Sequence, residues 1–315
     1  MKSLSLNRSI IDEFTLVGFS IPSHYIPLIF FILFLSYLLT MAGNVFILVL
    51  YFSNESLQKP MYFFICNLAI LDIIFINVIV PVLLKGVINQ SNRLSVAACL
   101  AQSYLYFLVG TTQFFLLDAM CIDRYLAICH PLHYPTIMQK KTCVWLVTGA
   151  WMSSFVSNIV PSVLIMKLSF CHKEINHFFC DIGPLLQNSC TNTTSLQLVV
   201  FFSSCSLIIS LFIATISYTY ILLAIARINS VEGRKRVLST CSSHALVVTI
   251  FFGSCISMYV KPVQYQSEVE CDKKVAILNT VVVPLINPYI YTLRNKVIRN
   301  IILSRKKKTR CFCCL

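Results

Sequence analysis

The stretch that decides the fold is Met120-Cys121-Ile122-Asp123-Arg124-Tyr125-Leu126-Ala127-Ile128-Cys129. It ends a long apolar run with an acid and an arginine side by side. An arginine within a bilayer is costly unless it has a partner or reaches the interface. The stretch therefore predicts that a membrane-spanning helix ends here, where hydrocarbon gives way to water.

The composition of the whole chain predicts a membrane protein. Hydrophobic residues make up 57% of its 315 residues and charged residues 12%, whereas soluble domains carry about 25% charged residues. A helix that crosses a bilayer needs about 20 apolar residues. Seven runs are long enough, at about 26–52, 61–84, 94–122, 142–166, 196–226, 237–260 and 275–293. Because these runs lack period-2 alternation, they predict an all-α membrane protein, a seven-transmembrane helix bundle, rather than a barrel.

The basic residues predict how the bundle is oriented. If alternate loops lie on alternate sides, one side holds 16 of the 25 Lys and Arg residues. The richer side is expected to be cytoplasmic and to attract anionic membrane lipid. We therefore predict a multi-pass plasma membrane protein with an extracellular tail at 1–25, a bundle at 26–293 and a cytoplasmic tail at 294–315. Nucleic acid is disfavoured as a partner, because the basic residues flank spans instead of forming one surface.

The C-terminal tail combines an apolar helical face with basic residues and cysteines. Val297, Ile298, Ile301 and Ile302 share one face, which predicts a short amphipathic helix in the inner membrane interface. Cysteines beside such a helix are candidates for palmitoylation. The candidates are Cys311, Cys313 and Cys314. The alternative is a frayed basic tail.

Three sequons for N-glycosylation lie on the predicted outer side. They begin at Asn7, Asn89 and Asn192. Asn7 lies farthest from the bilayer and is the favoured acceptor. Asn89 lies close to the end of a predicted helix, so it is a weaker candidate, as is Asn192.

Four cysteines on the predicted outer side, in a compartment that favours disulfides, are candidates to pair, and Cys271 is left over as a free thiol. The four are Cys99, Cys171, Cys180 and Cys190. Four cysteines allow three pairings, and spacing alone does not choose among them. A soft-metal cluster of His172, His177 and Cys180 is the alternative use. Its spacing fits no common zinc pattern, so we expect no metal and no cofactor.

Several segments resemble one known family. Beside the Asp-Arg-Tyr sequence at 123–125, they are Gly43–Asn44, Pro60–Asp72, Ser217–Tyr218, Arg236–His244 and Pro284–Asn295. They occur in order, each on the expected span, and together they cover nearly the whole chain. The chain resembles the rhodopsin-like G-protein-coupled receptors, and within them the olfactory receptors.

The resemblance implies an activation switch at the inner side. Asp123 would pair with Arg124 and hold the bundle shut, and activation would release Arg124 to meet a G protein. Pro288 permits a kink because proline lacks a backbone N–H. The residues that match the family's switch are Asp123, Arg124, Tyr125, Tyr218, His244, Asn287, Pro288 and Tyr291.

The resemblance also implies a polar network in mid-membrane, where a carboxylate such as Asp72 is functional by default. In the family this acid lies near Asn44 and Asn287 and helps to hold a sodium ion. The alternative is a protonated acid in a hydrogen-bond network that packs helices. Gln113 replaces the family's usual glutamate, should face Asp72 and should weaken a sodium site. The sequence leaves open what Asp118, another departure from the family pattern, does.

The resemblance also implies which cysteines form disulfides and where the ligand pocket lies. It pairs Cys99 with Cys180 and Cys171 with Cys190. It places the pocket between the third, fifth, sixth and seventh spans. The matching positions are Tyr106, Phe107, Gly110, Thr111, Phe202, Ser203, Ser206, Phe252, Cys255, Ile256, Tyr259, Ile277 and Thr280. This set contains no acid or base, so it favours a small neutral ligand held by burial and oriented by one hydroxyl.

The resemblance therefore implies an odorant receptor and not an enzyme. A small, mostly apolar volatile would bind, and a stimulatory G protein of the olfactory type would raise cyclic AMP. One alternative is a receptor of the same family that acts outside the olfactory epithelium. Another is a seven-span transporter, which is disfavoured because the chain shows no internal repeat. A membrane enzyme is disfavoured because no nucleophile–base pair lies on a span.

Overall fold

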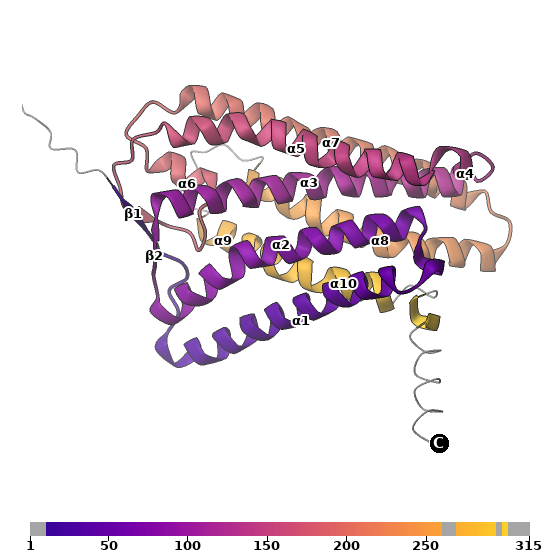
Figure 1. Cartoon of the computed structure of the whole chain (residues 1–315), viewed down its shortest axis with the longest axis horizontal. Helices are drawn as coiled ribbons and strands as arrows, with labels where there is room; N and C mark the ends of the chain where they lie inside the picture. Colours follow the sequence, from indigo (N-terminus) through magenta and orange to yellow (C-terminus); the bar gives the residue numbers. More distant parts are fainter. Residues whose placement is uncertain (1–10, 260–268, 294–297, 302–315) are drawn as a thin grey trace, which may run out of the picture.

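The computed structural model describes residues 11–259, 269–293 and 298–301. Seven apolar helical spans lie alongside one another within this part of the chain (Figure 1). Six are single helices, and the seventh is made of three segments. They are α1 (Ile26–Phe52), α2 (Pro60–Asn89), α3 (Val96–Cys129), α5 (Lys140–Met166), α7 (Thr194–Ala226), α8 (Val231–Tyr259), and then α9 (Val269–Ile277), the π-helical η4 (Leu278–Val282) and α10 (Val283–Leu293). The predicted fold class, an all-α seven-helix bundle, is confirmed.

Local sequence explains where several spans begin. Pro60 is the first residue of α2, and Pro27 is the second residue of α1. Proline suits these positions because the first N–H groups of a helix have no partner within it. Ser95 precedes α3 and accepts a hydrogen bond from the N–H of Ala98 at 3.2 Å, as an N-cap does.

The core of the bundle lies on α2, α3, α8 and the seventh span, whereas α1, α5 and α7 bury only a small share of their residues. The exposed side chains are large and apolar, for example Phe31 on α1 and Phe212 on α7. A helix that is hydrophobic on all sides is either buried in protein or surrounded by lipid. The three outer helices therefore present the lipid-facing surface of the bundle.

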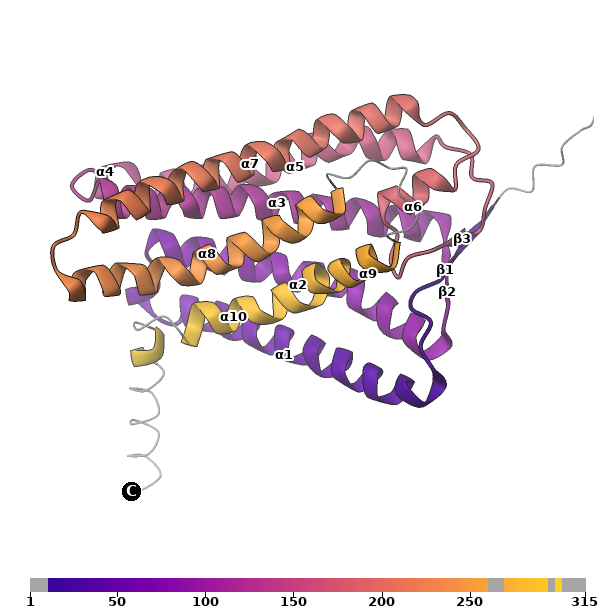
Figure 2. The same cartoon turned by 180° about the vertical axis from the view of Figure 1, so that it is seen from behind.

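A small sheet covers one end of the bundle, which we call the sheet end (Figure 2). Its strands are β1 (Glu13–Leu16), β2 (Asn92–Ser95) and β3 (Glu174–Ile175), in the order β2-β1-β3. The β1 strand runs antiparallel to β2 and parallel to β3. The sheet was not predicted from the sequence, because strands of four and two residues carry no detectable periodicity.

Short helices occupy the connections between the spans. They are η1 (Ser23–Tyr25), η2 (Glu55–Leu57), α4 (Tyr134–Ile137) and α6 (Ile182–Gln187). The α6 helix belongs to the loop that carries β3, at the sheet end, and α4 lies beyond the last residue of α3. We call the end of the bundle near α4 the Arg124 end.

Two disulfides hold the loop between α5 and α7. Cys99 at the start of α3 is bonded to Cys180, with a Cα–Cα distance of 5.4 Å. Cys171 is bonded to Cys190 within the loop, with a Cα–Cα distance of 5.3 Å. Phe14, Ile175 and the first disulfide share one small apolar cluster. The loop, the sheet and α3 therefore form one connected roof.

Part of the C-terminal segment packs against the Arg124 end. Residues 298–301 are helical, and Ile298 is buried against Leu50 of α1 and Leu57 of η2. Ile298 and Ile301, two of the four residues of the predicted amphipathic face, thus pack against the protein. Residue 297, residue 302 and the palmitoylation candidates Cys311, Cys313 and Cys314 lie outside the described residues, as does the glycosylation candidate Asn7.

Gly43 allows α1 to approach α10 closely. A Cβ added at Gly43 would lie 2.9 Å from Cγ of Pro288, whose ring cannot rotate away. Gly149 on α5 has nothing within 4 Å of an added Cβ. The two glycines therefore differ in what a methyl group would meet, although both are helical.

We expect Gly43→Ala to destabilise the fold and Gly149→Ala to leave it unchanged or slightly more stable. Overpacking of a well-packed contact costs about 1–3 kcal/mol, whereas alanine is the better helix former at an open position. The measurement is the apparent melting temperature of each protein purified in detergent. Equal melting temperatures for the two variants would contradict this account of the α1–α10 contact.

Candidate functional site

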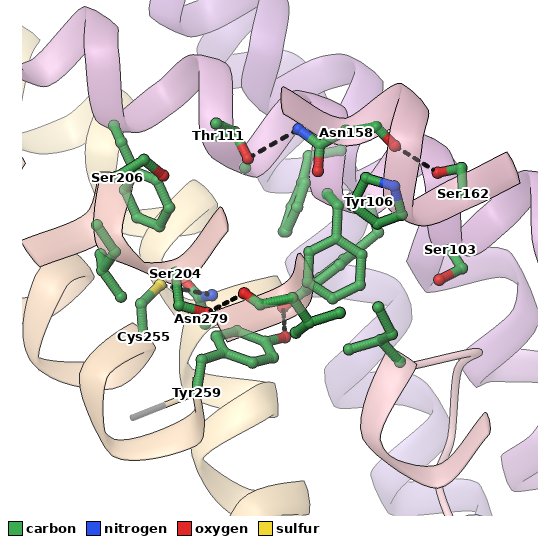
Figure 3. A pocket seen from close by; sticks show the side chains of 18 of the residues that line it. Ser103, Tyr106, Thr111, Asn158, Ser162, Ser204, Ser206, Cys255, Tyr259 and Asn279 are labelled. Carbon is green, nitrogen blue, oxygen red and sulfur yellow. Dashed lines mark hydrogen bonds between the residues drawn. The ribbon is translucent and has the colours of Figure 1, made fainter. Parts of the chain in front are cut away.

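A cavity lies inside the bundle, and Figure 3 shows most of the side chains that line it. Its volume is about 100 Å³. The lining comes from α3, α5, α7 and α8, with contributions from α2, α6 and η4. Most lining side chains are apolar or aromatic, and the polar ones are hydroxyls, amides and one thiol. The lining residues are Phe75, Ser103, Tyr106, Phe107, Gly110, Thr111, Phe114, Asn158, Pro161, Ser162, Ile165, Ile182, Val200, Ser204, Ser206, Leu207, Phe251, Cys255, Tyr259 and Asn279.

The structure brings some of the predicted pocket residues together and leaves others out. Those that line the cavity are Tyr106, Phe107, Gly110, Thr111, Ser206, Cys255 and Tyr259. Those that do not are Phe252, Ile256, Ile277 and Thr280. Phe252 is 1% exposed and stacks on Phe114 at 5.5 Å, one layer behind the cavity wall. The side chains of Phe202 and Ser203 lie outside the described residues.

One wall of the cavity comes from α5, which the family pattern did not include. Asn158, Pro161, Ser162 and Ile165 all lie on this helix and line the cavity. A detectable signal was present, because Asn158 is a polar residue in the middle of an apolar run, and such residues face protein or a cavity. The predicted position of the pocket therefore needs this addition.

A chain of hydroxyl groups closes the cavity toward the roof. The hydroxyls of Tyr106 and Tyr259 lie 3.0 Å apart, and the Tyr259 hydroxyl lies 3.4 Å from Oδ1 of Asp181. The predicted pocket set contains no acid, whereas the structure places the Asp181 carboxyl directly behind the tyrosine pair. Asp181 precedes Ile182, which lines the cavity, so the roof loop supplies both groups.

Burial controls the protonation of two loop residues in the roof. It raises the pKa of Asp181 to about 7; the Asp272 charge adds to the rise, and hydrogen bonds from Ile182 and Tyr259 oppose it. Burial also lowers the pKa of His177 to about 3, and the charge of Lys273 adds to that shift. His177 is therefore neutral at pH 7, when its Nδ1 accepts a hydrogen bond from the N–H of Phe179 at 3.4 Å.

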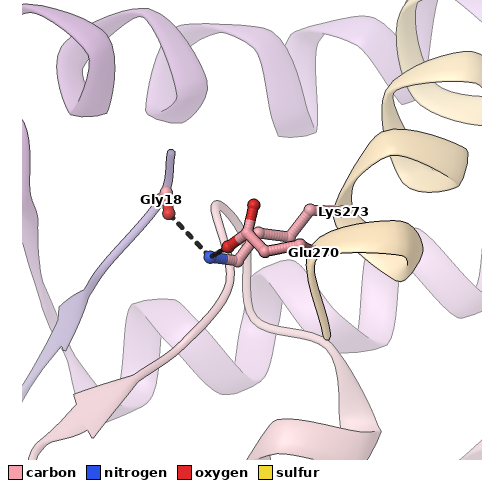
Figure 4. A network of polar contacts seen from close by, with 3 residues as sticks. All are labelled: Gly18, Glu270 and Lys273. Carbon is pink, nitrogen blue, oxygen red and sulfur yellow. Dashed lines mark hydrogen bonds and ion pairs between the residues drawn. The ribbon is translucent and has the colours of Figure 1, made fainter. Parts of the chain in front are cut away.

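A buried lysine ties the start of the seventh span to the N-terminal segment (Figure 4). Lys273 is 2% exposed and donates to the carbonyl of Gly18 at 2.8 Å. It also pairs with the Glu270 carboxylate at 2.8 Å. A buried ammonium needs such partners. The segment that follows β1 is thereby held across the bundle end.

The predicted polar network forms around Asp72. Its Oδ1 accepts a hydrogen bond from Nε2 of Gln113 at 2.8 Å, and its Oδ2 accepts one from Nδ2 of Asn287 at 3.0 Å. Asn44 is buried, but its amide donates to the Thr40 carbonyl at 3.0 Å. Both amides present N–H groups to the carboxyl rather than the oxygens that a sodium ion requires. Sodium binding therefore stays a prediction.

At the Arg124 end, Asp123 is bonded to a tyrosine instead of the expected arginine. Asp123 is 1% exposed and accepts a hydrogen bond from the Tyr134 hydroxyl at 2.8 Å. Among the described residues, no nitrogen of Arg124 lies within 4.0 Å of an Asp123 oxygen, so the predicted ion pair is not formed. Tyr134 of α4 takes the place of Arg124. This contact was not predicted from the sequence, because it depends on how the loop folds back.

The other predicted switch residues gather in the same region. The Tyr218 hydroxyl lies 2.6 Å from Nδ1 of His244, and this contact bridges α7 and α8. The Tyr125 hydroxyl lies 3.0 Å from Nε2 of His130. Within the described part of the chain, Nε2 of His244, the Tyr291 hydroxyl and Nε of Arg124 are buried without a hydrogen-bond partner. Their switching role stays a prediction.

Pro288 and Asp118 complete the positions singled out from sequence. Pro288 lies inside α10 and packs against Gly43. Asp118 is 5% exposed, and its Oδ1 is buried without a hydrogen-bond partner in the described residues. Asn89 is the last residue of α2 and Asn192 is exposed. The Asn192 side chain accepts from the Thr194 hydroxyl at 2.6 Å, and glycosylation there stays a prediction.

We expect Asp181→Asn to gain stability over the wild type as the pH rises from about 4 to about 7. The neutral acid tolerates burial and its ionised form does not, so the wild type is destabilised as Asp181 ionises, by up to about 4 kcal/mol. His177 is present in both proteins, so its opposite trend cancels in the comparison. The measurement is the melting temperature at pH 5, 6, 7 and 8.

The exposed Glu174→Gln variant is the control for this series, because it also removes one carboxylate from the roof loop. Its melting temperature should follow that of the wild type at every pH. A constant difference between Asp181→Asn and wild type across the series would contradict the burial of an ionisable Asp181.

Comparisons with known proteins identify the family. Residues 43–291 match the family described as 7 transmembrane receptor (rhodopsin family). Olfactory receptor 6F1 from Homo sapiens is 44% identical over 304 residues, covering 96% of this chain and 98% of the relative. Olfactory receptor 6C3 from Homo sapiens is 42% identical over 93% and 95% of the two chains, and Olfactory receptor 6E1 from Mus musculus is 42% identical over 97% and 98%. The seven spans, the inner Asp-Arg-Tyr sequence and these likenesses together show that the chain belongs to the rhodopsin family of seven-transmembrane receptors, among the olfactory receptors.

Proposed function

We propose that this receptor binds a small, neutral, mostly apolar odorant in the cavity and activates a stimulatory G protein of the olfactory type, which raises cyclic AMP. The observation that carries the proposal is the cavity itself. Its walls supply burial, which provides most of the affinity for a small apolar ligand, and its few hydroxyl and amide groups supply orientation. The names of the relatives support the same class of ligand.

The size of the cavity limits the ligand. An apolar cavity of about 150 Å³ accommodates benzene, whereas this one measures about 100 Å³. A ligand of about four non-hydrogen atoms therefore fills it, and a larger one needs side chains to move apart. A ligand of about ten non-hydrogen atoms, each contributing roughly −0.6 kcal/mol, would have a binding free energy of about −6 kcal/mol. This corresponds to a dissociation constant of tens of micromolar.

The switch at the Arg124 end is the proposed output. The odorant would bind the active arrangement more tightly and shift the population toward it. Arg124, Tyr218 and Tyr291 would then meet the G protein on the cytoplasmic side, and the sheet end would be extracellular. The excess of Lys and Arg in the loops of the Arg124 end supports this orientation.

The decisive experiment is a cyclic AMP assay with an odorant panel in transfected cells. Cell-surface receptor is quantified in parallel, and Arg124→Ala serves as the uncoupled control. We expect at least one odorant to raise cyclic AMP through the wild type and no odorant to do so through Arg124→Ala at equal surface level. The proposal would be overturned if no odorant raised cyclic AMP although the wild type reached the cell surface, or if Arg124→Ala signalled normally. Expression mapping separates this function from the same receptor acting in another tissue.

We expect Gly110→Ala to reduce the response to large odorants without loss of stability. Gly110 lines the cavity, and an added Cβ there meets nothing within 4 Å, so the methyl group occupies ligand space. One lost methylene contact is worth about 1 kcal/mol or about fivefold in affinity. The measurement is the half-maximal concentration for a homologous series, in which the shift should increase with ligand size.

Gly149→Ala is the matched control, because it adds the same methyl group at an open helical position that does not line the cavity. It should leave the whole series unchanged. If both variants shift the series equally, or Gly110→Ala shifts small and large odorants alike, the cavity is not where these ligands bind.

A further inference from the structure

Asn158 is a buried amide whose nitrogen is fully engaged and whose oxygen is not. It lies on α5, is 9% exposed and lines the cavity. Its Nδ2 donates to the carbonyl of Ser154 at 2.8 Å and to Oγ1 of Thr111 at 3.2 Å (Figure 3). In the described residues, no donor lies within hydrogen-bond distance of its Oδ1.

The chemistry of the partners fixes which way this amide points. A backbone carbonyl can only accept a hydrogen bond, so the atom that faces Ser154 must be the nitrogen. The oxygen is then the atom that remains for the cavity. A ligand that donates a hydrogen bond to this oxygen gains an interaction that a ligand without a donor lacks.

Thr111 places a donor beside this acceptor. Its hydroxyl accepts from Asn158 and also lines the cavity. The single proton of a threonine hydroxyl is therefore still available to a ligand. Neighbouring donor and acceptor groups match a ligand hydroxyl, which both donates and accepts. A carbonyl ligand can only accept, so it would leave the Asn158 oxygen unpaired.

Several other polar groups of the lining have partners within the protein. The hydroxyls of Ser162 and Ser204 donate to carbonyls of their own helices, at 2.7 Å and 2.9 Å. The Tyr259 hydroxyl donates to the Tyr106 hydroxyl at 3.0 Å, and the roof acid lies 3.4 Å from it as a second acceptor. Asn279 bonds to Tyr106 and lies 3.5 Å from the sulfur of Cys255, and its Oδ1 is a second acceptor without a hydrogen-bond partner in the described residues.

We propose that Asn158 and Thr111 form the polar subsite of the cavity and select alcohols over carbonyl compounds of the same carbon skeleton. The proposal rests on the proposed function, since it names the ligand class of the same cavity. It goes further because it assigns the discrimination between alcohols and carbonyl compounds to Thr111 on α3 and to Asn158 on α5. The family pattern did not include Asn158 in the pocket.

The test uses three matched pairs of probes: 1-hexanol and hexanal, cyclohexanol and cyclohexanone, and benzyl alcohol and benzaldehyde. The variants are Asn158→Leu, which removes the acceptor, and Thr111→Val, which removes the hydroxyl and keeps the shape. Ser162→Ala is the matched control, because it removes a hydroxyl of the same wall that is bonded within its own helix. The two readouts are ligand-induced thermal stabilisation of the purified full chain and cyclic AMP in cells.

We expect the wild type to prefer at least two of the three alcohols over their partners by about fivefold or more in half-maximal concentration. Asn158→Leu should raise the values for alcohols about 5- to 50-fold and change those for the carbonyl partners less than about threefold. Thr111→Val should reduce the preference as well, and Ser162→Ala should keep it. If Asn158→Leu does not fold, the alcohol preference of Thr111→Val tests the proposal.

The proposal is overturned if no pair shows an alcohol preference, if the variants weaken alcohols and carbonyls equally, or if Ser162→Ala matches Asn158→Leu. It is also overturned if no probe stabilises the purified protein. Selective binding of alcohols without cyclic AMP would support the subsite and refute the proposed function. Cyclic AMP responses without selectivity would refute the subsite and leave the proposed function standing.

Discussion

The structure depends on one buried carboxyl group, Asp72, and on the two amides that satisfy it. Asp72 is fully buried on α2, and each of its oxygens accepts from a different helix, α3 through Gln113 and α10 through Asn287. A buried acid is tolerated only when it is hydrogen-bonded, and hydrogen bonds are directional. These contacts therefore fix the rotation of three helices. Tyr106 lies two turns before Gln113 on α3 and is thereby held toward the cavity.

The roof at the sheet end is held by covalent and polar contacts. Lipid removes the hydrophobic driving force between helices, so other interactions must position them. The Cys99–Cys180 disulfide joins the roof loop to α3, and the three-stranded sheet joins that loop to the N-terminal segment. Lys273 adds the seventh span through Gly18. The residues that close the cavity, Asp181 and Ile182, therefore sit on a restrained support.

Both ends of the bundle contain buried polar atoms that have no hydrogen-bond partner among the described residues. At the sheet end and around the cavity they include Nε2 of His177 and Oδ1 of Asn279. At the Arg124 end they include Nε of Arg124, Nε2 of His244 and the Tyr291 hydroxyl. Unpaired buried groups are costly, so an arrangement that pairs them would be favoured. This agrees with the proposed switch, in which ligand and G protein stabilise another packing of the same helices.

The sequence by itself determined the fold class and the family, because a bilayer imposes a local requirement of about 20 apolar residues on each span and because the motifs are local. Tertiary structure alone decided which faces meet. Asn158 stands out in the sequence as a polar residue within an apolar run, but no local pattern shows that its helix forms a wall of the cavity or that Phe252 lies behind that wall. The Asp123–Tyr134 bond and the three-stranded sheet likewise depend on where loops return. Such contacts join residues that are distant in the chain, and a pattern within one segment does not encode them.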